Sequence, residues 1–490
     1  MPAIGSTAGP GTASAAGRSV NTPYIVMVIM SMATPMTVFT GIIVIGYAAT
    51  GLTGIPAAFL LSGLLMSLFY AAYTRMAPLI GNPGSFSGYI AHGLGRIAGV
   101  GGAFVALLSY GVLLWGLFGF VGTAAGPLAK KWLGVEAPWW VFALLAWAAV
   151  AWLGHRRVRD SARVVAVLLV LELGAIVVFS VTNLLHPADG VITTETLLPG
   201  TLFTPGMGAL LALTVIGFVG IEAVVVFAKE CADPGRTVPR AAQITIAATT
   251  VLYAGGSWAL SVAAGLDGIV DAARQHGTDL VFQLALPHLG ENAVDVMKLL
   301  LITSVVAAMI GFQGAGSRYL LALGKEHSLP RWLGTTSPRT GAPVAASRVQ
   351  SAVTLMVIVF YAVLDIDPVQ YLFYWAGAAG ALGVLMLMTA TAWSTVLYFA
   401  RTARDTPLFW WVVAGAGALG ISWMLFQVGS NFSLVLGSEP GSLPARIIPL
   451  VLCAAGAIGV TWGTWLRFTR PADYQAIGQG GTHEIAKAGR

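Results

Sequence analysis

The chain has 490 residues, of which 57% are hydrophobic and only 9% are charged, and its mean hydropathy is +0.81. This composition excludes an ordinary soluble globular protein and indicates a polytopic membrane protein. The formal net charge is +6, but the sequence contains no basic stretch interleaved with aromatic residues. This argues against a nucleic-acid partner.

Apolar stretches long enough to cross a bilayer recur along the whole chain. A transmembrane helix needs about 20 mostly apolar residues, and twelve stretches meet this requirement: 24–47, 53–74, 98–124, 138–155, 161–184, 205–228, 238–264, 293–321, 344–364, 370–400, 408–428 and 447–466. The sequence therefore predicts an all-α polytopic membrane protein with twelve transmembrane helices.

The distribution of Lys and Arg predicts the orientation, because short loops rich in these residues stay in the cytoplasm. With the N-terminus inside, all but five of the 26 Lys and Arg fall on the cytoplasmic side. We expect a multi-pass protein of the cell's inner (cytoplasmic) membrane with both termini cytoplasmic. Residues 1–20, rich in Gly, Ala, Ser and Pro without an apolar h-region, are expected to be a disordered tail, and 469–490 a second cytoplasmic tail.

Two spans that are five apart in order carry interruptions near their middle. The first contains "SMATPM", where Pro35 removes a backbone donor, and the sixth contains "GFVG". This arrangement predicts two inverted repeats of five helices, 21–190 and 200–402, with helices 11 and 12 (407–468) outside the repeat and the binding site where the breaks meet. Short amphipathic segments at 82–95 and 278–290 occupy equivalent places in the two repeats. The alternative is that Pro35 and the glycines merely kink packed helices.

Three segments carry a family resemblance: "GNPGSFSGYIAHGLGRIAGVGGAFVALLSYG", "GFVGIEAVVVFAKECADPGRTVPRAA" and "SRYLLALGKEHSLPRWLG". Together they resemble the amino acid–polyamine–organocation (APC) permeases, and the resemblance covers about residues 24 to 400. It implies the LeuT-type fold and transport of a small-molecule substrate. The sequence of the first break differs from the Gly-rich "GSGIF"-like motif of the family. At the second break, Ile216 occupies a position where some members have an aromatic residue.

A broken helix leaves backbone N–H and C=O groups without intrahelical partners, which a zwitterionic amino acid could satisfy. We expect its carboxylate to meet N–H groups around Thr37 and Val38, and its ammonium to meet carbonyls around Ala33, Ile216 and Gly217. Gly217 and Gly220 would allow the unwinding. The predicted substrate-binding residues are Ala33, Thr34, Thr37, Val38, Tyr110, Ile216, Gly217, Phe218, Gly220 and Phe312.

Two carboxylates lie at membrane depth, where an ionisable group normally marks a functional site. Glu222 follows the second break and is either a cap for exposed N–H groups or a gating residue. Glu172 lies midway along the fifth span, where desolvation favours its neutral form, so we predict a proton-coupling role. A structural hydrogen bond, or sodium ligation together with Thr303 or Ser304, remains open; Glu172, Glu222 and Ser304 are the candidate coupling and gating residues.

We therefore expect a secondary active transporter that imports an amino acid or related amine, with the proton as coupling ion and no enzymatic activity, cofactor or metal. The alternatives are a polyamine or cationic amine transporter or exchanger, and a membrane sensor that binds its ligand without moving it. No G-x-x-x-x-G-K-[ST] motif occurs in the sequence, which argues against an ATP-driven pump. The charge pattern leaves a neutral and a cationic substrate open.

Overall fold

The computed structural model describes residues 20–80, 86–154, 162–337, 341–402 and 406–478, and these residues form helices without any strand. The spans, in chain order, consist of α1 (Thr22–Met32) with α2 (Pro35–Thr37), the π-helical η1 (Val38–Ile42) and α3 (Ile43–Thr50); α4 (Ile55–Met76); α6 (Arg96–Leu133); α7 (Trp139–Leu153); α8 (Ala162–Leu185); α10 (Met207–Phe218) with the 3-10 helix η5 (Ile221–Glu230); α11 (Pro234–Ala264); α13 (Leu280–Lys325); α14 (Val344–Val363); the π-helical η8 (Pro368–Trp375) with α15 (Ala376–Thr402); α16 (Leu408–Ser430); and α18 (Leu443–Thr469).

Short helices occupy the connections between these spans. They are η2 (Ala77–Leu79), α5 (Phe86–Gly93), η4 (Glu195–Leu197), α9 (Pro199–Leu202), α12 (Ile269–His276), η6 (Gly277–Asp279), η7 (Arg331–Gly334), α17 (Phe432–Val435) and α19 (Pro471–Ala476). Among them, α5 corresponds to the predicted segment at 82–95, of which residues 82–85 lie outside the described part. The tails predicted at 1–20 and 469–490 lie mostly outside it as well.

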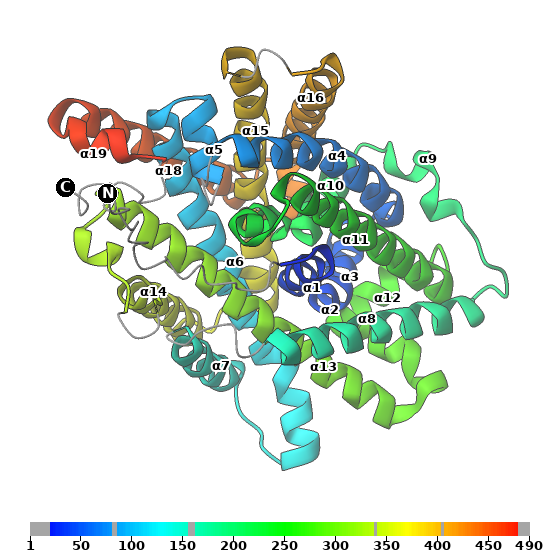
Figure 1. Cartoon of the computed structure of the whole chain (residues 1–490). Helices are drawn as coiled ribbons and strands as arrows, with labels where there is room; N and C mark the ends of the chain where they lie inside the picture. The colour runs from blue at the N-terminus through cyan, green and yellow to red at the C-terminus, as the bar shows by residue number, and fades with distance from the viewer. Residues whose placement is uncertain (1–19, 81–85, 155–161, 338–340, 403–405, 479–490) are drawn as a thin grey trace, which may run out of the picture.

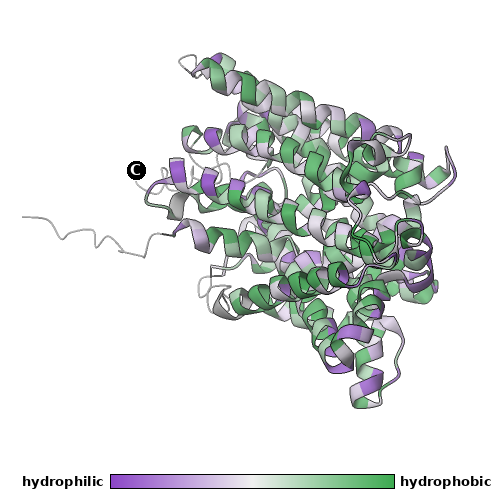
Figure 2. Ribbon diagram, turned by 90° about the vertical axis from the view of Figure 1, so that its right-hand side faces the viewer, coloured by the Kyte–Doolittle hydropathy of each residue, from purple (hydrophilic) through white to green (hydrophobic). Residues whose placement is uncertain are grey.

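Length and apolarity confirm the prediction of an all-α polytopic membrane protein. In the described part of the chain, 11 helical segments are long and apolar enough to cross a membrane, and the shorter apolar helix α7 corresponds to the remaining predicted span. Figure 2 shows mostly hydrophobic residues along the helices and hydrophilic residues gathered toward their ends. This pattern is expected for helices whose middles face lipid or protein and whose ends face water.

The two interrupted spans lie in the middle of the bundle. In Figure 1, α1, α2, α3 and α10 occupy the centre, with other spans arranged around them. The buried share of the apolar window is 83% for the first span and only 11% for the last. Because lipid surrounds the outer helices, backbone interruptions are tolerated only in central spans such as these, where protein or ligand can satisfy the freed groups.

Both predicted breaks are present, but the second begins later than the sequence suggested. Helix α10 continues through Gly217 to Phe218, and the chain becomes extended only at Val219. A Cβ on Gly217 would lie 2.9 Å from the Tyr253 ring and 3.1 Å from Phe59. Gly217 therefore permits close packing against these rings, and the unwinding itself falls on Val219 and Gly220.

The second predicted amphipathic segment, at 278–290, is the first part of α13. There Gly290 has a non-helical backbone (φ 77°, ψ 166°), which separates a short leading helix from the long span that follows. Glycine is suited to this position because positive φ strains residues that carry a Cβ. The segment thus forms an arm at one end of the eighth span.

Candidate functional site

The first break is built around a residue with left-handed backbone geometry. Helix α1 ends at Met32, Thr34 has φ 47° and ψ 65°, and Pro35 starts α2 with no N–H to donate. The N–H of Val38 donates to the Thr34 carbonyl at 3.2 Å. The helix start therefore leaves the N–H groups of Met36 and Thr37 without intrahelical partners, whereas the N–H of Val38, which we had expected to meet the substrate, is already used.

The second break depends on Gly220, whose φ of 103° disfavours any side chain. The Val219 N–H donates to the Ile216 carbonyl at 3.3 Å. The N–H of Gly220 donates to Oε2 of Glu222 at 2.8 Å. The carboxylate of Glu222 thus satisfies a donor that the unwound segment exposes, as the capping interpretation of the sequence expected.

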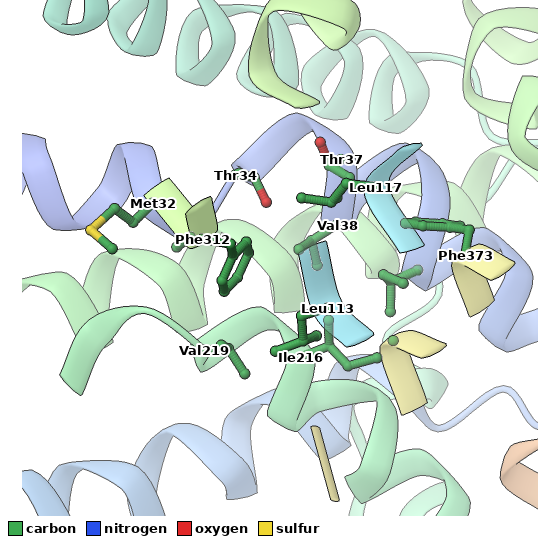
Figure 3. A pocket seen from close by; sticks show the side chains of 13 residues that line it. Met32, Thr34, Thr37, Val38, Leu113, Leu117, Ile216, Val219, Phe312 and Phe373 are labelled. Carbon is green, nitrogen blue, oxygen red and sulfur yellow. The ribbon is translucent and has the colours of Figure 1, made fainter. Parts of the chain in front are cut away.

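A cavity lies where the two breaks meet (Figure 3), and its empty space, counting the mouth, is about 450 Å³. Its lining residues are Met32, Ala33, Thr34, Thr37, Val38, Ile42, Leu113, Leu117, Ile216, Val219, Phe312, Phe373 and Gly377. Six of the ten residues predicted to bind substrate are therefore brought together here: Ala33, Thr34, Thr37, Val38, Ile216 and Phe312. The lining contains no charged side chain.

The only lining side chains with an oxygen or nitrogen atom are Thr34 and Thr37. In Figure 3 the Thr34 hydroxyl points toward Phe312 and Val38, whereas the Thr37 hydroxyl points the other way. The Thr37 hydroxyl is buried without a hydrogen-bond partner. A ligand in this cavity would meet one hydroxyl, the backbone of the breaks and otherwise apolar surface.

The other four predicted binding residues lie outside this lining. Gly217 packs against Tyr253, and Phe218 is fully buried with its ring 6.3 Å from that of Phe59. Gly220 lies against Met32, which a Cβ would approach to 3.3 Å. Tyr110 lies on α6 beside the cavity, with its ring 6.2 Å from that of Phe312.

Sequence reasoning missed several lining residues. Leu113 and Leu117 follow Tyr110 at three and seven positions on α6, and this spacing places all three on one helix face. The spacing could therefore have identified both leucines. Phe373 lies on η8, outside both breaks, and was not among the predicted residues. Gly41 leaves room for the Phe373 ring, since a Cβ there would approach it to 3.0 Å, and the ring stacks on Phe120 at 4.3 Å.

Glu222 lies in a group of buried tyrosines. The Tyr110 hydroxyl donates to Oε1 of Glu222, and the Tyr73 hydroxyl donates to the Glu222 carbonyl at 3.4 Å. The Tyr70 hydroxyl lies beside the same carboxylate, without making a hydrogen bond. Glu222 therefore ties the second half of the sixth span to α6 on one oxygen and to the unwound Gly220 on the other.

Glu172 on α8 is 4% exposed and faces the first break. It lies beside the Ser304 side chain of α13 and the backbone of Met36. The Ser304 hydroxyl is buried and has no hydrogen-bond partner. The structure thus brings Glu172 together with Ser304. It also places Glu172 beside α2, the short helix that has the cavity residues Thr34 and Thr37 at its two ends.

Comparison with known families settles which class this arrangement belongs to. A family model described as amino acid permease matches residues 23–453. The chain belongs to the amino acid permease family. The resemblance to the APC permeases found in the sequence is therefore confirmed, and the permease has the all-helical polytopic fold expected of that family.

Curated relatives are similar at low identity. The Lysine-specific permease LysP of Lactococcus lactis is 25% identical over 322 residues, covering 62% of this chain and 61% of LysP. The Branched-chain amino acid permease BcaP of the same species is 24% identical over 308 residues, covering 58% and 64%. The Cationic amino acid transporter 1 of Arabidopsis thaliana is 24% identical over 282 residues, covering 53% and 46%. The matches span less than two thirds of each relative's length, and the relatives' names give different substrates.

Proposed function

We propose that this permease is a secondary active transporter that imports a small amino acid by alternating access, with a proton as coupling ion. The observation that carries the proposal is the cavity at the meeting point of two interrupted spans, because broken helices expose the backbone donors and acceptors that a zwitterion needs. Membership of the amino acid permease family supports the same activity.

The lining of the cavity favours a neutral substrate with an apolar side chain. Burying an unpaired charge is costly, so a site for a cationic side chain is expected to place a carboxylate within reach. The four buried acids of the described residues, Glu172, Glu222, Asp295 and Glu326, all lie outside the lining, and Glu222 already accepts hydrogen bonds on both oxygens. The side chain of the substrate would instead contact Leu113, Leu117 and Phe373.

Glu172 is the proposed proton site. A carboxylate at membrane depth that faces other elements can load and release a proton as its surroundings change. Its neighbour Met36 lies in α2, between Thr34 and Thr37. A change in the position of α2 on substrate binding would therefore change the surroundings of the Glu172 carboxylate. This supplies a physical link between binding of the substrate and binding of the proton. Ser304, with its unpartnered hydroxyl, would stabilise one protonation state.

The proposal includes the orientation and the domain organisation. Both termini would lie in the cytoplasm of a cell whose inner membrane the protein spans, as the loop charges favour. Residues 21–190 and 200–402 would form the inverted repeats, and helices 11 and 12 (407–468) would lie outside them. Glu222, tied to Tyr110, would act as a gating residue between the sixth span and α6.

The test is uptake by purified protein in liposomes. A panel of radiolabelled neutral amino acids, cationic amino acids and polyamines is offered with and without an inward proton gradient. We expect gradient-stimulated uptake of a neutral, apolar amino acid, abolished by a protonophore. Uptake that responds only to preloaded internal amino acid would identify an exchanger, and binding without uptake under any gradient would identify a sensor.

A cationic substrate is the second candidate. The buried carboxylates Glu172 and Glu222 lie near the breaks, and the described part of the chain has no buried Lys or Arg. This arrangement would suit an amine if Glu172 turned toward the cavity. The relatives LysP and Cationic amino acid transporter 1 carry names with this chemistry. In the same assay, uptake of lysine or a polyamine in preference to leucine would favour this candidate.

A further inference from the structure

A second, smaller cavity lies along the same two helices as the first. On α13, Phe312 lines the first cavity, whereas Tyr319 and Leu323, with Glu326 directly after the end of the helix, line the second. On α6, the first cavity is lined by Leu113 and the second by Gly99 and Ala103. Since a helix rises 1.5 Å per residue, Phe312 and Glu326 lie about 20 Å apart along the axis.

A wall of aromatic side chains separates the two cavities. The ring of Tyr110 lies 5.6 Å from that of Tyr319 and 6.2 Å from that of Phe312. The Tyr110 hydroxyl is bonded to Glu222. A substrate leaving the first cavity along α6 and α13 would therefore have to pass this wall and enter the second cavity.

The segment that follows the last span lines one side of the second cavity. Ile477 and Gly478, which come directly after α19, complete its lining. Ile477 is 4% exposed and packs with Val100 of α6 and Leu466 of α18. A Cβ on Gly478 would lie 2.9 Å from Ala91 of α5. The segment thus fills a gap between three elements.

Polar contacts hold the segment against the end of α13. The N–H of Gly478 donates to Oε1 of Glu326 at 3.0 Å, and this bond is buried. Nδ1 of His327 lies 2.6 Å from Oδ1 of Asp473. The guanidinium of Arg96, at the start of α6, lies 5.8 Å from the centre of the Tyr474 ring. Each contact joins the segment to an element that lines the second cavity or flanks it.

We propose that residues 471–478 form a releasable plug that closes the cytoplasmic exit of the transport path. The contacts that hold the segment include the Ile477 side chain, the Gly478–Glu326 hydrogen bond, the His327–Asp473 contact and the Arg96–Tyr474 contact. They form a small interface compared with the packing of a transmembrane span. It would leave its seat when the cytoplasmic side opens and return when it closes. This inference rests on the proposed transport function and orientation.

The first experiment measures access to the second cavity without using transport. In a background in which Cys231 and Cys453 are replaced by Ser, Ala322→Cys places a thiol in the lining. The rate of its reaction with a membrane-impermeant maleimide is measured from the cytoplasmic face of inside-out vesicles. We expect Ile477→Asp to raise this rate about tenfold or more, because a carboxylate cannot remain in the apolar contact with Val100 and Leu466.

The matched control is Ala472→Asp, which adds the same charge to the same segment at an exposed position. It should leave the rate unchanged. An Ile477→Asp protein that melts at the parental temperature and reacts no faster than the control would overturn the proposal. If the parent transports none of the offered substrates, the proposed function fails, while the reaction rates still decide whether the segment covers the cavity.

A second measurement covers the case in which Ile477→Asp fails to fold. His327→Cys with Asp473→Cys places two thiols at the contact between α13 and the segment, where a short bifunctional thiol reagent with a reducible disulfide spacer can join them. Cross-linking should stop substrate uptake in liposomes, and reduction should restore it. Full uptake by the cross-linked protein would show that the segment can stay in place during transport, which is incompatible with a plug.

Discussion

Two of the buried carboxylates of this permease, Glu222 and Glu172, have different surroundings. Glu222 accepts from the Tyr110 hydroxyl and from the Gly220 N–H, so both of its oxygens are used by the protein. Glu172 is also buried and lies beside the Met36 backbone and the Ser304 hydroxyl, which has no hydrogen-bond partner. The comparison teaches that burial alone does not identify a proton site. A buried carboxylate whose oxygens all accept hydrogen bonds from the protein is held in one protonation state.

Replacement of Glu222 should have the largest effect on stability. Glu222→Ala leaves a buried hydroxyl and a buried N–H without an acceptor, and each unsatisfied group costs about 1–3 kcal/mol. We expect the free energy of unfolding to fall by about 2–4 kcal/mol and the melting temperature of the detergent-solubilised protein to fall with it. Tyr110→Phe, which removes only one donor, should lose roughly half as much. An unchanged melting temperature of Glu222→Ala would mean that the carboxylate has no structural role.

A substitution at Gly220 changes the donor side of the hydrogen bond between the Gly220 N–H and the Glu222 carboxylate. Its φ of 103° would cost a residue with a Cβ about 1–2 kcal/mol, by analogy with other left-handed positions. Gly220→Ala should therefore lower the melting temperature less than Glu222→Ala does. Gly217→Ala is a useful comparison, because its Cβ would crowd the buried rings of Tyr253 and Phe59 and leave the positive-φ position at Gly220 unchanged. Substrate affinity that falls in Gly220→Ala and is preserved in Gly217→Ala would assign the unwinding to Gly220.

Glu172 should affect coupling and leave stability nearly unchanged. Glu172→Gln keeps the volume of the side chain and removes its ability to change charge. We expect proton-gradient-stimulated accumulation to fall about tenfold, the size of a typical coupling between two sites, while exchange of labelled for unlabelled substrate continues. The control is Glu195→Gln, an exposed acid outside the spans. Gradient-driven accumulation that survives in Glu172→Gln would remove this residue as the coupling site.

The sequence predicted the spans and both breaks because these depend on local properties: apolar length, a proline within a helix and paired glycines. It also predicted most of the cavity lining that lies on the breaks themselves. It could not predict that Gly217 packs against Tyr253, since this contact joins residues 36 positions apart on different helices. The same holds for the Tyr110–Glu222 bond, which spans 112 positions, and for Phe373, which lines the cavity from η8.

The smallest expected effect concerns the one hydroxyl that points into the cavity. Thr34→Ala removes it without disturbing a hydrogen bond of the protein, and alanine lacks the β-branch that makes left-handed geometry costly at this position. A hydrogen bond to substrate is worth about 0.5–1.5 kcal/mol, so the Kd for substrate should rise by about three- to tenfold at an unchanged melting temperature. Thr34→Ser should bind nearly as well as the parent, because it keeps the hydroxyl. Thr37→Val, whose lost hydroxyl points away from Thr34 in Figure 3, should also bind normally. Equal affinities of Thr34→Ala and Thr34→Ser, measured by radioligand binding to the purified protein, would mean that substrate contacts only backbone and apolar side chains at the first break.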